Sequence, residues 1–146
     1  MKRRNKIYIA GIVIFTLIVL NNCGESEEAR LQRRLNNFRK ALPLEIREKF
    51  DKGEYEEAGR LLDERLQRIK SYLKLFPDYE SKRKFIRGDY NGLEKYIKNI
   101  PKEDLEFNRK IYKIIDYECI PTFNGYQMVD YFRVYFKEKL ERMKNK

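Results

Sequence analysis

Apolar residues recur at helical spacing along most of the chain. Leu31, Leu35, Phe38 and Leu42 follow one another at intervals of four, three and four residues, which places them on one face of a helix. We predict further helices with comparable stripes over about 44–50, 55–76, 79–87, 90–100, 102–120 and 126–142. The side chains expected in the core of these helices are Leu44, Ile46, Phe50, Ala58, Leu62, Leu66, Ile69, Leu73, Phe76, Phe85, Ile86, Leu93, Ile97, Ile100, Leu105, Ile111, Ile114, Ile115, Val129, Phe132, Phe136 and Leu140.

Glycine and proline divide these segments. Pro43 can open a helix, Pro77 and Pro101 end the preceding ones, and residues 121–125 form the clearest loop. No stretch alternates apolar and polar residues with β-branched side chains, so we predict no strands. Short connections between helices favour antiparallel neighbours. The expected fold class is all-α, a small bundle or an array of antiparallel helical hairpins.

The first residues follow a different pattern. Lys2, Arg3, Arg4 and Lys6 are basic, and the segment Ile7 to Leu20 then contains no charge. As a helix, that segment would span roughly 21 Å, whereas the hydrocarbon core of a bilayer is about 30 Å thick. A basic start followed by a short apolar run is typical of a secretory signal peptide. With its positive charges on the cytoplasmic side, such a segment predicts that the rest of the chain is exported.

The run ends in Leu20-Asn21-Asn22-Cys23. This segment resembles the signal of bacterial lipoproteins, in which a leucine three residues before a cysteine helps to define a lipobox. Asn22 stands where Gly, Ala or Ser is usual, as in the looser boxes of spirochaete lipoproteins. The resemblance implies a signal peptide over 1–22 and acylation of Cys23. The alternatives are an uncleaved signal anchor, in which Cys23 is an ordinary thiol, and a cleaved, unanchored protein.

Residues 23–28 are then expected to be the acylated cysteine with a short tether, and 29–143 a single helical domain. Ser26 offers a second interpretation of the tether, because it can cap a helix whose first turn contains acidic residues.

A short element recurs at the helix junctions. Gly53-Glu54-Tyr55-Glu56-Glu57-Ala58 returns 35 residues later as Gly88-Asp89-Tyr90-Asn91-Gly92-Leu93. The pattern resembles the turn into the second helix of tetratricopeptide repeats, whose period is about 34 residues. We expect the glycine to adopt a left-handed cap, the acid to cap the next helix, and the tyrosine to pack between the two helices. The alternative is an unrelated small helical bundle.

Composition limits the chemistry. The formal net charge is +10, but acids are interleaved with the bases, and an exported protein does not meet nucleic acid. The chain has two cysteines and no histidine. If Cys23 is acylated, Cys119 has no partner for a disulfide within the chain, and we expect a buried, inert thiol there. Without histidine, the commonest metal ligand and the commonest general base are both missing.

The densest acidic cluster comprises Glu54, Glu56, Glu57, Asp63 and Glu64. Basic residues are interleaved with it at three- and four-residue spacing, which favours a solvated helix face over a metal or acid/base site. We therefore predict no enzyme activity, no metal site and no cofactor.

The last helix carries the candidate interaction residues. Tyr126, Tyr131, Phe132 and Tyr135 make it aromatic on more than one face, and exposed aromatic side chains are enriched at interfaces. We hypothesise a partner-binding surface there, with plain burial as the alternative.

A basic tail follows, with Lys137, Lys139, Arg142 and Lys144. We expect it either to lie on anionic lipid headgroups or to form a solvated, fraying end.

The whole sequence thus predicts a lipoprotein whose helical domain binds an envelope or surface protein. A signal-anchored accessory protein that self-associates is the alternative. The partner, the membrane and its face, and the oligomeric state are left open by the residues.

Overall fold

The computed structural model describes residues 24–117 and 124–146. All regular secondary structure in this part of the chain is helical, so the expected all-α class is confirmed. The helices are α2 (Glu27–Ala41), α3 (Leu44–Asp51), α4 (Tyr55–Ser71), α5 (Tyr79–Ile86), α6 (Glu94–Ile97), α7 (Lys102–Tyr117), α8 (Gly125–Tyr131) and α9 (Lys139–Lys144). A 3-10 turn, η1 (Tyr72–Leu75), follows α4, and a π-helical segment, η2 (Phe132–Glu138), joins α8 to α9. The predicted lipobox and Cys119 lie outside the described residues.

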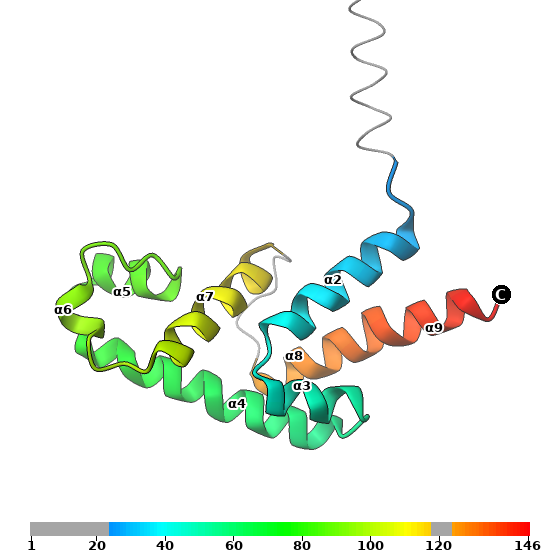
Figure 1. Ribbon diagram of the computed structural model, residues 1–146, viewed down its shortest axis with the longest axis horizontal. Helices are drawn as coiled ribbons and strands as arrows, with labels where there is room; N and C mark the ends of the chain where they lie inside the picture. The colour runs from blue at the N-terminus through cyan, green and yellow to red at the C-terminus, as the bar shows by residue number, and fades with distance from the viewer. Residues whose placement is uncertain (1–23, 118–123) are drawn as a thin grey trace, which may run out of the picture.

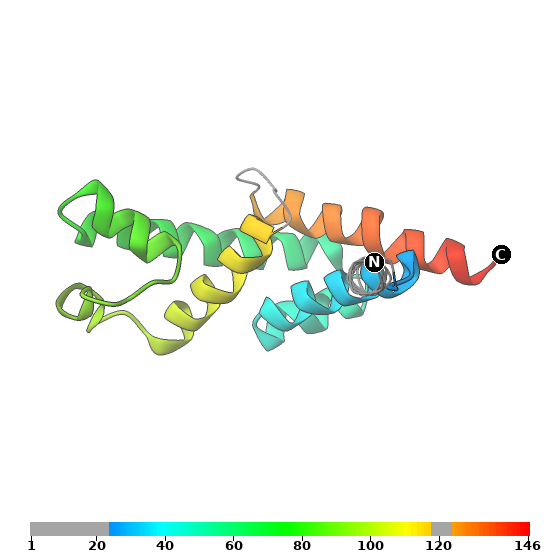
Figure 2. The same cartoon turned by 90° about the horizontal axis from the view of Figure 1, so that it is seen from above.

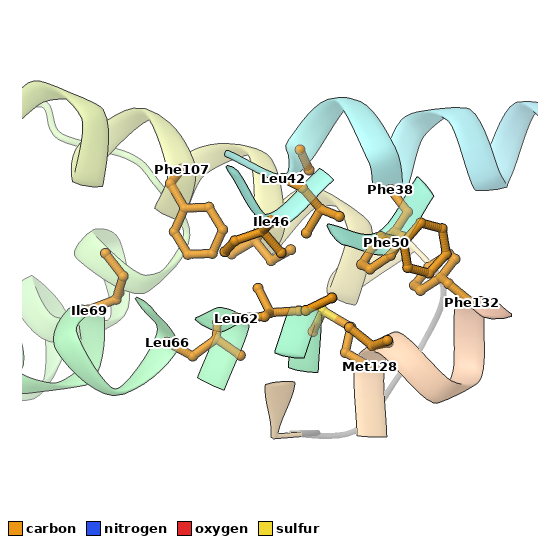
Figure 3. Packing of buried hydrophobic residues seen from close by; sticks show 14 of the residues in the cluster. Phe38, Leu42, Ile46, Phe50, Leu62, Leu66, Ile69, Phe107, Met128 and Phe132 are labelled. Atoms are coloured by element: carbon orange, nitrogen blue, oxygen red, sulfur yellow. The ribbon is translucent and has the colours of Figure 1, made fainter. Parts of the chain in front are cut away.

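Helix α4 runs along much of the molecule, and α3 and α8 pack directly against it (Figure 1). Its first half lies against α3 and α8. Leu62, Leu66 and Ile69 face side chains contributed by α3 and α7, among them Ile46 and Phe107 (Figure 3). One continuous core therefore joins both halves of the described chain.

Most of the predicted apolar stripes are buried. Each residue of the first stripe, from Leu31 to Leu42, is less than 9% exposed, and the cluster continues through Leu62, Phe85 and Ile111. Two expectations are wrong, because Leu44 is 66% exposed and Ile86 is 43% exposed. Helical spacing alone does not show that α3 and α5 are too short to bury every apolar residue they carry.

Helices α4 and α8 touch through their backbones. A Cβ atom on Gly125 would lie 2.1 Å from the backbone nitrogen of Asp63, and one on Gly59 would lie 3.0 Å from Cα of Tyr126. The Asp63 carboxylate also accepts a hydrogen bond of 3.1 Å from the Gly125 amide. Only glycine permits this approach, which fixes where the last helix begins on α4. Gly125 was expected in a loop, but it is the first residue of α8, with Asn124 as its N-cap.

The last helix changes its winding at η2. Met128, Phe132, Phe136 and Leu140 are all buried, each four residues after the one before. In an α-helix, a four-residue step drifts by about 40° around the axis. The wider π-helical turns wind more slowly and oppose this drift. The segment therefore keeps these side chains on one buried face of the last helix, where Phe132 meets Phe38 of α2.

Two chain segments differ from the predicted helices. The helix expected over 55–76 ends at Ser71 and continues as η1. The helix expected over 90–100 is reduced to the single turn of α6. Gly92 has φ of +77° just before that turn, a conformation that a continuous right-handed helix does not contain.

At the N-terminus, Ser26 caps α2 by accepting a hydrogen bond from the Ala29 amide. The helical part accordingly starts at Glu27, before residue 29.

The recurring Gly-acid-Tyr element forms the same turn twice. Gly53 and Gly88 have φ of +80° and +70°, as expected for left-handed caps. In each turn, the glycine amide donates a hydrogen bond to the carbonyl of a phenylalanine three residues earlier. The amide of the acidic residue after the glycine donates to the carbonyl of the lysine that precedes this phenylalanine. This is the Schellman arrangement. The tyrosine then packs edge-on or tilted against that phenylalanine, as in the Phe85–Tyr90 pair, whose ring centres lie 5.9 Å apart.

The acids of the two turns do not cap the next helix as expected. The Glu54 side chain makes no cap hydrogen bond. It pairs instead with Lys49 at 2.7 Å, back across the turn. In the second turn, Asp89 likewise lies 4.0 Å from Lys84, the lysine five residues earlier. The chain diverges after each turn, into the long helix α4 in one case and into the single turn of α6 in the other, so the tetratricopeptide resemblance stays a prediction.

The two turns provide a matched test of packing against backbone strain. A Cβ at Gly53 would make only an ordinary contact of 3.9 Å with the Tyr55 ring, so alanine there incurs only the cost of a left-handed conformation, about 1–2 kcal/mol. A Cβ at Gly88 would also lie 2.9 Å from Cα of Arg109 in α7, and overpacking adds about 1–3 kcal/mol. We expect Gly88→Ala to lower the free energy of unfolding clearly more than Gly53→Ala in urea denaturation. Equal losses would contradict the close approach of this turn to α7.

Candidate interaction surfaces

The structure places Phe132 in the core. Its side chain is 0% exposed, and its ring stacks on Phe38 of α2 with a centroid distance of 4.0 Å and an interplanar angle of 3°. Phe136 stacks on Phe132 from the next turn at 4.9 Å. Of the residues proposed for partner binding, Phe132 thus joins the last helix to α2 and has no surface to offer.

The three tyrosines of the proposed surface are more accessible. The rings of Tyr131 and Tyr135 stack at 5.6 Å, with Tyr131 half-buried and Tyr135 48% exposed. Val134 beside them is 47% exposed. Tyr126 is also exposed but lies against Gly59 and lines an open depression of about 540 Å³ between α8 and the start of α4. Neither Tyr131 nor Tyr135 lines that depression, so the structure separates Tyr126 from the other two.

The basic tail is partly tied to the rest of the protein. Lys137 donates a hydrogen bond of 2.9 Å to the Tyr55 hydroxyl, with its ammonium group 5.8 Å from the centre of the Phe50 ring. Lys139 pairs with Glu27 at 2.5 Å, and this hydrogen bond raises the pKa of the lysine and lowers that of the glutamate. Arg142 lies 3.6 Å from Glu138. Lys144 is exposed beyond these contacts.

The Lys139–Glu27 pair brings the two ends of the described chain together. It joins α9 to the first residue of α2, and the end of α9 lies on the same side of the molecule as the start of α2 in both views (Figures 1 and 2). The basic tail and the segment that follows Cys23 are therefore neighbours, although they are separated by most of the sequence.

A buried carboxylate joins α7 to α4 and η1. Asp104 in the first turn of α7 is 0% exposed. It accepts hydrogen bonds from Arg65 at 2.7 Å and from the Tyr72 hydroxyl at 2.6 Å, one at each oxygen. Burial, and then the hydrogen bond to Asp104, raise the pKa of Tyr72 to about 12. Both carboxylate oxygens are thus occupied in holding α7 to α4 and η1.

Sequence reasoning did not single out Asp104. Its position in the sequence gives one indication of burial, because it lies one turn before Phe107 and Asn108 on the buried face of α7. Its partner Arg65, however, is 39 residues away in the chain, so the salt bridge cannot be inferred from neighbouring residues.

The acidic cluster of α4 is distributed over several partners. Arg60 bonds to both Glu57 and Glu64, Glu54 pairs with Lys49, and Asp63 accepts from Gly125. Within residues 24–117 and 124–146, no group of three or more acidic or cysteine side chains is arranged to hold a metal ion. Over the same residues, none of the helices combines the length and the apolar character that crossing a bilayer requires.

Comparisons with known proteins give no guide to these surfaces. No protein-family model matches the sequence, and neither the curated proteins nor the solved structures provided a match.

Phe132 and Tyr135 form a matched pair for testing the orientation of the last helix. Phe132→Ala removes a fully buried ring and should cost about 3–5 kcal/mol of unfolding free energy. Tyr135→Ala removes a half-exposed ring and should cost about 1 kcal/mol or less. Chemical denaturation followed by circular dichroism measures both values, and the reverse order would show that the helix is rotated.

Tyr72→Phe tests the buried Asp104 site. Loss of a hydrogen bond to a carboxylate should destabilise the protein by about 1–3 kcal/mol at neutral pH. The raised pKa also predicts pH dependence. Above pH 10 the unfolded tyrosine releases its proton before the folded one does, so stability falls as the pH rises from about 10 to about 12. Denaturation across this range should show a shallower fall for Tyr72→Phe than for the wild type. The exposed Tyr79→Phe serves as the control and should leave both quantities unchanged.

Proposed function

We propose that this protein is a bacterial lipoprotein, exported and held at a membrane by acylation of Cys23, whose helical domain binds another protein of the cell envelope or surface. The observation that carries the proposal is the sequence of the first residues, a basic cluster and a short apolar run that end at Leu20-Asn21-Asn22-Cys23. Each methylene of an acyl chain contributes about 0.8 kcal/mol to membrane binding, and stable anchoring needs more than one chain. The lipoprotein resemblance implies several chains on Cys23.

The described fold is compatible with such an anchor. Helix α2 begins at Glu27, a few residues after Cys23, so the domain lies close to the membrane surface. The Lys139–Glu27 pair brings the basic tail to the same end of the molecule. In the proposal, Arg142 and Lys144 contact anionic headgroups, each charge contributing about 1 kcal/mol near the surface. The tail then orients a domain that the lipid alone would leave free to rotate.

We further propose that the domain acts by binding and not by catalysis, and that it needs no cofactor. This view is supported by the lack of histidine in the chain and by the use of the buried Asp104 in a salt bridge between helices. Tyr126, Tyr131 and Tyr135 are the exposed or half-exposed aromatic residues of the last helix that a partner can contact.

The mass of the mature N-terminus in the native membrane tests the anchor. For the wild-type chain we expect a peptide that begins at an acylated Cys23. Cys23→Ser should abolish acylation and leave the leader attached, whereas Cys119→Ser, the matched control at the other cysteine, should behave as the wild type. A wild-type chain with an intact Met1 and no acyl group would reject the proposal in favour of a signal-anchored protein. A cleaved chain without lipid would favour an unanchored one.

A further inference from the structure

A second exposed apolar area lies on α5, away from the residues singled out in the sequence. A shallow depression of about 260 Å³ between η1, α5 and α7 is lined by the apolar or aromatic residues Leu73, Tyr79, Ile86 and Tyr112 and by the basic residues Lys82, Arg83 and Arg87. We call these residues the α5 patch. Tyr79, at 79%, is the most exposed large apolar side chain among the described residues, and Ile86 is 43% exposed.

The size of the depression indicates what it can accept. Pockets for drug-sized ligands usually measure about 300–1,000 Å³ and enclose most of the ligand. At about 260 Å³ and open on one side, the depression suits one bulky apolar side chain and not a whole small molecule. A side chain presented by a protein segment leaves its backbone and flanking residues outside, over Lys82 and Arg87.

The charges around the depression indicate which residues should flank the inserted side chain in a binding partner. Between Tyr79 and Arg87 the chain has four bases and one acid, Glu80, and that acid is paired with Arg83 at 3.0 Å. Within the described chain, neither Lys82 nor Arg87 lies close enough to an acid to form a salt bridge, and Lys82 acts on the Asp78 carboxylate only at longer range. Arginine binds carboxylates through two parallel hydrogen bonds and is enriched at protein interfaces. The patch therefore attracts acidic groups next to its apolar floor.

No segment of the protein itself is suited to supply the acidic groups and the apolar side chain that the α5 patch would bind. The basic leader has the wrong charge, since Lys2, Arg3, Arg4 and Lys6 precede its apolar run. The acidic residues after Cys23 lie at the other end and are used there, as in the Glu25–Arg33 pair. A second copy of the chain is disfavoured because each copy is basic, with a net charge of +10 for the whole sequence and +6 without the four bases of the leader.

The position of the patch favours a protein over a lipid surface. Helices α5 and α6 lie at the opposite end of the long axis from the start of α2 (Figures 1 and 2). If Cys23 holds the start of α2 at a membrane, the α5 patch is held away from the headgroups at the anchor. This choice of occupant rests on the proposed anchor, whereas the apolar floor and the cationic edge do not.

We propose that the α5 patch binds an acidic segment of another protein, which inserts one bulky apolar side chain between Ile86 and Tyr112 and places carboxylates on Lys82 and Arg87. Tyr79 then closes over the inserted side chain from the solvent side. Because the cations are exposed, the interaction weakens as the ionic strength increases.

Short fluorescent peptides and the detergent-solubilised full chain test this proposal, and acylation of Cys23 does not enter the result. The probe is an acidic peptide with a central phenylalanine, compared with the same peptide carrying alanine there and with one carrying lysines in place of the acids. We expect saturable, salt-sensitive binding of the first peptide by fluorescence anisotropy. The alanine peptide should bind about tenfold more weakly, and the lysine peptide should not bind.

Two matched variants locate the site. Ile86→Glu and Val134→Glu each place a carboxylate on a half-exposed aliphatic residue, of 43% and 47% exposure, the first in α5 and the second in η2. Ile86→Glu and Arg87→Glu should each weaken peptide binding about tenfold or more, and Val134→Glu should leave it unchanged, with thermal melting confirming that all three variants are folded.

Several results would overturn the proposal. These are no saturable binding of the acidic phenylalanine peptide, equal loss of binding in Ile86→Glu and Val134→Glu, and dimerisation of the wild type that Ile86→Glu abolishes. Binding of the wild type to anionic vesicles that is lost in Ile86→Glu would assign the patch to a lipid surface instead. None of these results depends on the mass of the N-terminus, so failure here is distinguishable from failure of the proposed anchor.

Discussion

The backbone contact between α4 and α8 is the constraint on which the C-terminal half of the core depends. Gly59 and Gly125 bring the two helices so close that no side chain separates them, and the Asp63 carboxylate holds the Gly125 amide. With its start fixed on α4, the last helix can only run toward α2. Its four-residue apolar spacing then requires the looser winding of η2 to keep Phe132 stacked on Phe38. A steric requirement at one crossing thus explains an unusual helical segment several residues later.

The half of the molecule that contains α5 and α7 depends on a polar contact. Asp104 is fully buried, and its two oxygens are bonded to Arg65 of α4 and to Tyr72 of η1. A buried carboxylate without partners is strongly destabilising, so α7 has little freedom to shift once this pair is formed. Since Tyr112 belongs to α7 and Leu73 to η1, the same contact fixes two walls of the α5 patch. The geometry of the exposed α5 patch therefore depends on the buried Asp104 carboxylate.

Local patterns in the sequence were sufficient for what is local in the fold. The stripe from Leu31 to Leu42 and the left-handed glycines at 53 and 88 depend on residues within one or two turns. The errors arise where distant segments decide. Leu44 is apolar, but no other helix covers it. Phe132 is predicted both as a core residue and as a candidate partner-binding residue, because its partner Phe38 is far away in the chain. The role of Asp104 is missed for the same reason, because a buried salt bridge leaves no signature in the sequence around either partner alone.

Charge and apolar surface are combined differently at the two ends of the molecule. Near the start of α2, some acids and bases are paired, as in the Glu27–Lys139 and Glu25–Arg33 pairs, but the basic tail at that end adds further bases such as Lys144. Around α5 the bases also outnumber the acids, and the apolar surface between them is uncovered within the described chain. Both ends therefore attract acidic groups at long range. What distinguishes the α5 end is the apolar surface beside its bases, which can hold an acidic partner after the first encounter.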